Sequence, residues 1–235
     1  MFDAQGTQHV VYIGASDAHV HELWWDLDGW HHNDLTAATG SPQAAGDRGP
    51  VGYLFDAQNT QHVFYIGSLD AHVHELWWDD NGWHHNDLTV AAAAPNAGFV
   101  GMSGYVFDAQ GTQHVVYAGA DKHVHELWWH TSGWHHNDLS AATGAPDLAD
   151  SGPAGYIYDV QRTQHVVYVG ADSHVHELWW HTSGWHHNDL SAATGAPAAD
   201  TAFDRGPAGY AFEAQRTQHV IFVGADAHIY EMWWG

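Results

Sequence analysis

One unit occurs five times in this chain of 235 residues, and it constrains the fold more than any other feature. The copies align on the pattern Asp/Glu-x-Gln-x-Thr-Gln-His, which starts at Asp3, Asp56, Asp108, Asp159 and Glu213 and so recurs every 51 to 54 residues. Repetition at a fixed period indicates a fold built by copying one supersecondary unit, because each unit buries its apolar faces against its neighbours. Any function carried by the unit is therefore repeated along the chain.

Each unit divides at glycines and turn residues into four short segments rich in Val, Tyr, Phe and Trp, which predicts four β-strands. In the third copy these segments are 104–109, 113–119, 123–129 and 133–140. Two tight turns, Gly-Ala-Asp-Lys and His-Thr-Ser-Gly, separate the second, third and fourth segments and are typical of hairpins. A longer Ala/Thr/Gly/Pro stretch of variable length then leads to the next copy.

Four antiparallel strands per unit, repeated five times, predict an all-β fold of the β-propeller class. We expect a single domain whose blades comprise residues 1–50, 51–103, 104–154, 155–208 and 209–235. The Gly-Tyr-Val-Phe segment begins with a small residue and suits the crowded innermost position, whereas the polar Gly-Trp-His-His-Asn-Asp-Leu segment suits the outer edge. The predicted architecture is a five-bladed propeller.

The fifth copy stops at Glu-Met-Trp-Trp-Gly and lacks the outer Gly-Trp-His-His strand. Three arrangements follow from this: a ring that ends in a three-stranded blade, a segment of a larger ring, or a homo-oligomer joined through the unpaired edge of the last blade. Because the copies are so alike, we expect a recently amplified or engineered array. The first ten residues lack the basic and apolar regions of a signal peptide, and the localisation stays open.

The charge excludes several classes of partner. Five Lys+Arg against 28 Asp+Glu give a formal net charge of −23, although 24 histidines hold the sequence pI near 5.2. A strong negative field argues against binding to nucleic acid and anionic membranes, whose phosphates need Lys and Arg. No apolar run is long enough to span a bilayer, so we expect no membrane insertion. With no cysteine, disulfides and thiolate metal sites are excluded.

A carboxylate recurs within the aromatic His-x-His-Glu-Leu-Trp-Trp strand, at Glu22, Glu75, Glu126, Glu177 and Glu231 (Tyr replaces the second His in the last copy). A buried charge is costly unless it is paired or hydrogen-bonded, and five cationic side chains are too few for a repeated ion pair. Each Glu therefore either faces a polar ligand or accepts hydrogen bonds from neighbouring His, Trp or backbone groups.

Tryptophan is abundant, with 14 in the chain. On an extended strand Glu22 and Trp24 share one face, while His21 and Trp25 share the other. A flat aromatic face beside a carboxylate suits a sugar, which presents C–H patches beside hydroxyls. The Trp residues on the Glu face are Trp24, Trp77, Trp128, Trp179 and Trp233; the other interpretation is that many of the tryptophans are inter-blade core.

The Trp-His-His-Asn-Asp segment also contains side chains that bind metals. His32 and Asp34 share a strand face, but the adjacent His31 points the other way. We therefore predict hydrogen bonds that tie strand to loop, and no metal site or cofactor. Carboxylates that come one per unit do not form an acid/base pair, so we expect no enzyme activity.

Taken together, these motifs resemble the blade of fucose-binding propeller lectins, most closely the bacterial seven-bladed type with Gly-Trp-His-His-Asn-Asp-Leu repeats and more distantly the fungal six-bladed type. The likeness covers all five copies. It implies sugar pockets between adjacent blades, with the recurring Glu contacting sugar hydroxyls and an aromatic residue of the next blade stacking on the ring. In place of the fungal type's Arg, this chain has histidines at His9, His62, His114, His165 and His219.

The sequence thus predicts a multivalent lectin for glycans, with inter-blade sites for fucose or a related hexose. The alternative is a structural or protein-interaction propeller in which Glu and Trp belong to the core. An imidazole can donate a hydrogen bond to a sugar hydroxyl, but it lacks the two parallel donors and the constant positive charge of an Arg guanidinium. The replacement of Arg by His therefore leaves the identity of the sugar open.

Overall fold

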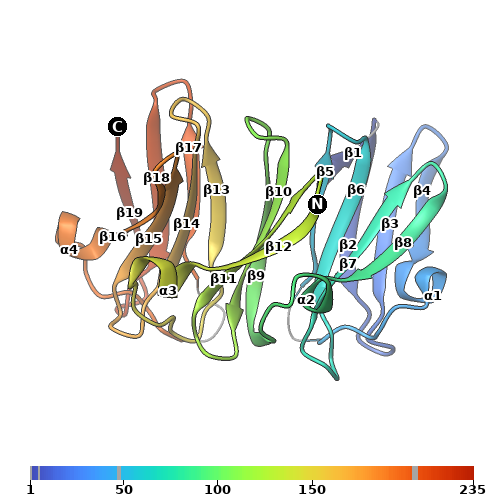
Figure 1. Cartoon of the computed structure of the whole chain (residues 1–235), viewed down its shortest axis with the longest axis horizontal. Coiled ribbons are helices and arrows are strands. Elements are labelled where there is room, and N and C mark those ends of the chain that lie inside the picture. Colours follow the sequence, from blue (N-terminus) through green and yellow to red (C-terminus); the bar gives the residue numbers. More distant parts are fainter. Residues whose placement is uncertain (1, 5, 47–48, 203–205) are drawn as a thin grey trace.

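A computed structural model describes residues 2–4, 6–46, 49–202 and 206–235. Its strands form five separate antiparallel sheets that follow one another along the chain (Figure 1). Four sheets have four strands and the last has three, as the repeat predicts. The five-bladed propeller architecture is therefore confirmed.

Each blade is one sheet, and the first four blades are each followed by a short helix. Blade 1 contains β1 (Phe2–Ala4), β2 (Thr7–Ile13), β3 (Val20–Asp26), β4 (Gly29–Asp34) and α1 (Leu35–Thr39). Blade 2 contains β5 (Val51–Phe55), β6 (Thr60–Ile66), β7 (Val73–Asp79), β8 (Gly82–Asp87) and α2 (Leu88–Ala91). Blade 3 contains β9 (Ala97–Phe107), β10 (Thr112–Gly119), β11 (Val124–His130), β12 (Gly133–Asp138) and α3 (Leu139–Thr143). Blade 4 contains β13 (Ala154–Tyr158), β14 (Thr163–Val169), β15 (Val175–His181), β16 (Gly184–Asp189) and α4 (Leu190–Thr194), and blade 5 contains β17 (Ala208–Phe212), β18 (Thr217–Val223) and β19 (Ile229–Trp234).

Strand order within each blade follows the sequence, so every connection is a simple hairpin. The first strands of consecutive blades contact one another, which places them innermost and leaves β4, β8, β12 and β16 at the outer edge. Both positions agree with the sequence prediction. In the third blade Glu126 of β11 lies opposite Asn137 of β12, and the neighbouring pair is His125 and Asp138.

The outer strands end earlier than the sequence predicts, because a short helix begins where the fourth segment was expected to continue. In blade 3 the strand ends at Asp138, whose side chain accepts a hydrogen bond from the Ala141 N–H, and α3 ends at Gly144 with a φ of 68°. Asp is a favoured N-cap, and Gly readily adopts the left-handed conformation that ends a helix. The Asp-Leu-Ser-Ala-Ala-Thr-Gly stretch thus carries its own start and stop signals, which sequence reasoning assigned to strand and loop.

The hydrophobic core lies between blades, at four junctions. Val115 and Val116 of β10 point to opposite faces of the same sheet, and both are fully buried, one against blade 2 and one against blade 4. Close packing there depends on glycine: a Cβ on Gly155 would lie 2.3 Å from the Tyr105 ring of the preceding blade. Each fully buried large apolar side chain contributes about 1.5–3 kcal/mol, so the fold is stabilised mainly by what each blade buries on the next.

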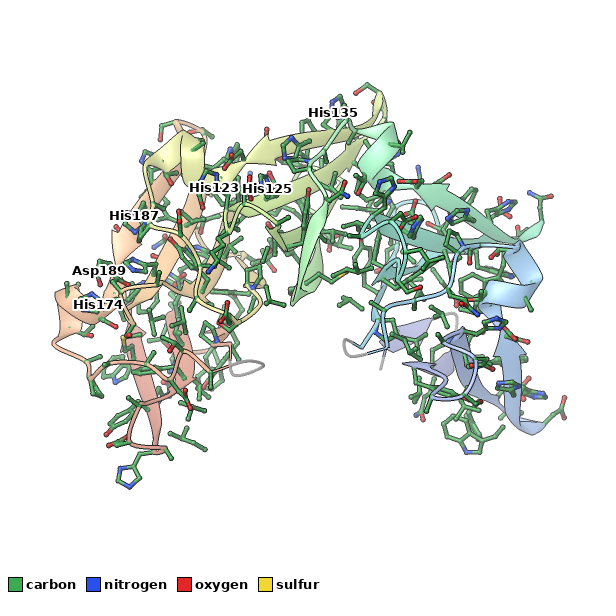
Figure 2. All side chains as sticks on the ribbon, turned by 90° about the horizontal axis from the view of Figure 1, so that it is seen from below. His123, His125, His135, His174, His187 and Asp189 are labelled. Atoms are coloured by element: carbon green, nitrogen blue, oxygen red, sulfur yellow. The ribbon has the colours of Figure 1, made fainter. Side chains whose placement is uncertain are left out.

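The five blades form an open arc, with blades 1 and 5 at its two ends (Figure 2). Blade 5 consequently has one uncovered face, on which Phe212 is 44% and Trp233 64% exposed. None of the helices in the described part of the chain has the length and apolar character needed to cross a membrane.

Candidate functional site

Three pockets of the same construction lie at the junctions between blades 1 and 2, 2 and 3, and 3 and 4. The preceding blade supplies a His, a Glu, an Asn and the first Trp of the Trp-Trp pair. The following blade supplies a Gln, the second Trp of its own pair and the Trp of Gly-Trp. The shared sets are His9, Glu22, Trp24, Asn33, Gln61, Trp78 and Trp83; His62, Glu75, Trp77, Asn86, Gln113, Trp129 and Trp134; and His114, Glu126, Trp128, Asn137, Gln164, Trp180 and Trp185. One further polar side chain of the preceding blade lines each pocket: Thr7, Gln58 and Gln110, respectively.

Strand alternation explains why two blades share each pocket. Trp128 and Trp129 are consecutive on β11, so they point to opposite faces of the blade. Trp128 lines the pocket shared with blade 4, and Trp129 lines the pocket shared with blade 2. One Trp-Trp pair therefore serves two sites.

A hydrogen-bonded chain holds the carboxylate in each pocket. In blade 3, His114 Nδ1 lies 2.8 Å from Glu126 Oε1, and Asn137 Nδ2 donates to Glu126 Oε2 over 2.8 Å. Because the carboxylate only accepts, the imidazole hydrogen resides on Nδ1, and the Thr112 hydroxyl, 2.7 Å away, donates to Nε2. Glu126 is only 2% exposed, yet each of its oxygens has a protein donor and keeps acceptor capacity for a ligand.

At the last two junctions a buried tyrosine of the preceding blade fixes the glutamine of the following one, whereas at the junction of blades 2 and 3 the Tyr53 hydroxyl and Gln113 Oε1 have no partner in the described structure. Tyr105 donates to Gln164 Oε1 over 3.2 Å, and Tyr156 donates to Gln218 Oε1 over the same distance. Burial, together with the nearby Glu177, raises the pKa of Tyr156 far above its ordinary value, so the phenol stays a donor at any physiological pH. The Gln side-chain amide is thereby oriented at the last two junctions.

Some polar atoms at the junctions have no hydrogen-bond partner in the described structure. The indole Nε1 atoms of Trp77, Trp128 and Trp179 are buried and unpartnered. Each of these rings stacks on a histidine of its own outer strand; the Trp128 and His135 centroids are 4.4 Å apart. Trp77 and Trp128 each line one of the pockets, and each of these two pockets therefore combines a rigid aromatic wall with one carboxylate and three side-chain amides.

The structure places the predicted site residues in three different settings. His9, Glu22, Trp24, His62, Glu75, Trp77, His114, Glu126 and Trp128 line the three pockets. At the fourth junction His165 and Asn188 hold the buried Glu177 in the same way, with Trp179 on the same strand face, but blade 5 supplies no counterpart of Trp185. On blade 5, His219 still bonds Glu231, but Glu231 is 47% exposed, and Trp233 faces no further blade.

Sequence reasoning missed half of each pocket. The Gln of Thr-Gln-His, the second Trp, the Trp of Gly-Trp and the Asn of His-His-Asn recur in every complete copy, and this recurrence was the available signal. Their role depends on which strand face meets which neighbour, and one unit considered alone does not show it. The predicted bond between strand and loop at Asp34 exists, but its partner is His19 in the turn, whereas His32 contacts His21.

The pockets are small, with cavity volumes of about 160–230 Å³. Pockets for drug-sized ligands are about 300–1,000 Å³, so a compact group such as one sugar ring is the appropriate scale. No Lys or Arg is among the lining residues of the three pockets, and each has a single carboxylate. This arrangement suits a neutral ligand rich in hydroxyls.

No protein-family model matches the sequence, and no curated protein matches it either. Solved structures do resemble the fold. The lectin BP39L from Burkholderia pseudomallei has a TM-score of 0.69 and 13% identity over 99% of this chain and 64% of that chain. AofleA from Arthrobotrys oligospora has a TM-score of 0.66 and 15% identity over 99% and 70%.

The fucose-specific lectin from Aleuria aurantia has a TM-score of 0.60 and 14% identity over 97% of this chain and 74% of that one. The chain has the propeller fold of these lectins. It spans between 64% and 74% of their length.

Proposed function

We propose that this propeller is a multivalent lectin that binds fucose or a related hexose in its inter-blade pockets, and that it acts by binding and not by catalysis. The observation that carries the proposal is the threefold recurrence of one polar and aromatic set in separate pockets. A set retained only for packing would not need a carboxylate with both oxygens oriented by donors. The likeness to lectins, one of them described as fucose-specific, supports the same conclusion.

The chemistry of a pocket assigns a role to each group. The carboxylate of Glu126 accepts from one or two sugar hydroxyls, and the side-chain amide of Gln164 offers both a donor and an acceptor. The tryptophans pack against the C–H face of the ring. Because the pocket contains one carboxylate and no Lys or Arg, acidic sugars are disfavoured next to Glu126.

The three complete pockets are expected to bind alike, and the fourth junction more weakly because it lacks the third tryptophan. Single sites of this size and exposure bind weakly, and binding to a glycan-covered surface gains strength from simultaneous engagement.

Isothermal titration calorimetry with α-methyl-L-fucoside tests the proposal. The expected result is three sites of similar affinity per chain, lost together in the triple variant Glu22→Gln, Glu75→Gln, Glu126→Gln. A matched control is Glu213→Gln, which alters a carboxylate outside the three pockets and is expected to bind normally.

A glycan array with neutral and acidic sugars complements this titration. Binding of neutral hexoses without acidic ones supports the proposed chemistry. Absence of binding to any sugar, with circular dichroism showing a folded chain, would contradict the lectin function and favour a protein-interaction propeller.

A further inference from the structure

A second cluster of polar side chains recurs in the four complete blades, on the face opposite the sugar-pocket carboxylate. In blade 3 this His–Asp cluster consists of Asp121, His123, His125, His136 and Asp138. The equivalent sets are Asp17, His19, His21, His32 and Asp34; Asp70, His72, His74, His85 and Asp87; and Asp172, His174, His176, His187 and Asp189. Figure 2 shows His123 beside His125, and His174 and His187 near Asp189.

The period-two alternation of strands brings the cluster together. Asp121, His123 and His125 are spaced two apart through the turn and into β11, and His136 and Asp138 are spaced two apart on the adjacent β12. Side chains two residues apart on a strand share a face. Because His125 lies opposite Asp138 in the register, the two sets meet at one end of the blade.

Short hydrogen bonds hold the cluster together and bring potential ligand atoms close to one another. His123 Nδ1 lies 2.9 Å from Asp138 Oδ2, His125 Nε2 lies 3.0 Å from Asp121 Oδ1, and His125 Nδ1 lies 3.0 Å from His136 Nε2. One ligand atom from each of Asp121, His123 and Asp138 lies within 4.8 Å of the others. Bonds of about 2.0–2.2 Å to a central Zn²⁺ separate neighbouring ligand atoms by about 3.0–3.5 Å, so small side-chain movements suffice.

The cluster is anchored on one side and open on the other. His125 is buried at 1% exposure, whereas the side chains of Asp121, His123 and Asp138 are between 29% and 45% exposed. Gly119 makes room for the inner part, since a Cβ there would lie 2.3 Å from the Asp121 carboxylate. The side chain of the neighbouring Lys122 is exposed to solvent, and its ammonium lies 4.0 Å from the exposed carboxylate of Asp150. A cation can therefore enter from solvent.

We propose that each His–Asp cluster binds a divalent transition-metal cation of the Zn²⁺ class through the two carboxylates and an imidazole. The ligand sets are Asp17, His19 and Asp34; Asp70, His74 and Asp87; Asp121, His123 and Asp138; and Asp172, His174 and Asp189. Imidazole with carboxylate suits Zn²⁺, Cu²⁺ or Ni²⁺, whereas Mg²⁺ and Ca²⁺ prefer oxygen ligands alone. On binding, the hydrogen between His123 and Asp138 moves to His123 Nε2, and the imidazole stays neutral.

Blade 5 provides an internal comparison. It has Asp226 and His228, but Tyr230 stands where blade 3 has His125, and its hydroxyl donates to Asp226 over 2.7 Å. Blade 5 contains no counterparts of His136 and Asp138, because its described strands end with β19. Four cation sites are therefore expected, against three complete sugar pockets.

Titration of the untagged, chelator-treated chain with ZnCl2 in a calorimeter tests this site. The expected stoichiometry is four Zn²⁺ per chain, and CaCl2 at the same concentration gives no heat. The variant Asp138→Asn should reduce the count to three, and Asp34→Asn, Asp87→Asn, Asp138→Asn, Asp189→Asn together should reduce it to zero. Asn caps a helix as well as Asp does, so these variants keep the N-caps of the short helices.

A matched control separates the cluster from exposed histidines at the surface. His130→Gln alters an exposed imidazole at the end of β11, outside the cluster, and is expected to leave four sites. Zn²⁺ binding that persists in the quadruple Asn variant, or that falls with His130→Gln, would overturn the assignment, as would no Zn²⁺ binding by the parent chain. Circular dichroism and the fucoside titration, which is independent of these aspartates, verify that each variant is folded.

Discussion

Blades 3 and 5 are built from nearly the same sequence unit but differ in what covers them. Phe107 in blade 3 is 1% exposed, whereas Phe212 at the equivalent position of blade 5 is 44% exposed. Val116 is fully buried, and its counterpart Ile221 is 36% exposed. The sheets themselves are alike, because β18 and β19 pair in the same register as β10 and β11.

This difference separates the strand pairing within a blade from the burial of side chains between blades. Backbone pairing within a blade comes from the unit's own sequence, and blade 5 has it without a further neighbour. Burial of the outward face comes only from the next blade. The candidate sugar site follows the second rule, since the next blade completes the pocket around Glu126, whereas Glu231 is 47% exposed and no described blade follows it.

The largest expected effect is on stability. Phe107→Ala should lower the free energy of unfolding by about 3–5 kcal/mol, because it removes a buried ring that packs edge-on against Trp180 with centroids 6.2 Å apart. Urea denaturation followed by tryptophan fluorescence measures this loss as a lower midpoint.

Phe212→Ala is the paired variant at the end of the arc. It should cost less than about 1 kcal/mol, because much of that ring already faces solvent. Equal losses in the two variants would mean that the outward face of blade 5 is covered in solution.

A smaller effect is expected on sugar binding. Glu75→Gln should weaken one of the three complete pockets by tenfold or more, since a hydrogen bond to a charged group is worth about 1.5–3 kcal/mol. The calorimetric stoichiometry with α-methyl-L-fucoside should then fall from three to two. Glu231→Gln changes the same residue where no neighbouring blade completes the pocket, and it should leave three sites. A fall to two sites in Glu231→Gln would show that blade 5 forms a working pocket by itself or with a partner.

The smallest effect concerns alkaline pH. The pKa of Tyr156 is raised by burial and by Glu177, so its contribution to stability is complete below the unfolded value of 10.0 and is lost as the pH rises above it. Tyr156→Phe should cost about 0.5–1.5 kcal/mol at pH 8, from the hydrogen bond to Gln218, and should reduce the loss of stability between pH 9 and 11.

Tyr210→Phe is the matched variant, because Tyr210 occupies the same position in blade 5 and is 42% exposed. Desolvation and Glu231 raise the pKa of Tyr210 as well, but solvent screens this exposed phenol, so the alkaline denaturation profile of Tyr210→Phe should change less than that of Tyr156→Phe. If the two Phe variants have the same profile, the buried phenol at the inner junction is not the group that responds to pH.

The repeat predicts much of the fold. The alternation of apolar residues around Val115 and Val116 predicts a strand covered on both faces, and the missing Gly-Trp-His-His segment predicts the three-stranded last blade. The helix after Asp138 was not predicted, because four or five residues of Leu, Ser, Ala and Thr are too few for a helical pattern, and only the capping residues mark it.

The sequence predicts the part of the candidate site that comes from a single unit, and not the part that the next blade supplies. Glu126 and Trp128 share a strand face, so the sequence of one unit places them together. Gln164 and Trp185 reach the same pocket from another blade, and their approach depends on the twist between sheets. Likewise, His123 and Asp138 are 15 residues apart, and only the register of β11 with β12 makes them neighbours.

Each pocket belongs to the boundary between two units and not to one unit. The number of pockets in an open array is therefore set by the number of junctions, which is one less than the number of units. Inserting one more copy of the unit into the middle of the arc would add one pocket, because the inserted copy supplies half of each of the two pockets that it then borders. A substitution in one unit would alter the pocket on one side or on the other, according to the strand face it occupies. A repeat protein of this kind can thus diversify neighbouring sites independently while it keeps a single structural unit.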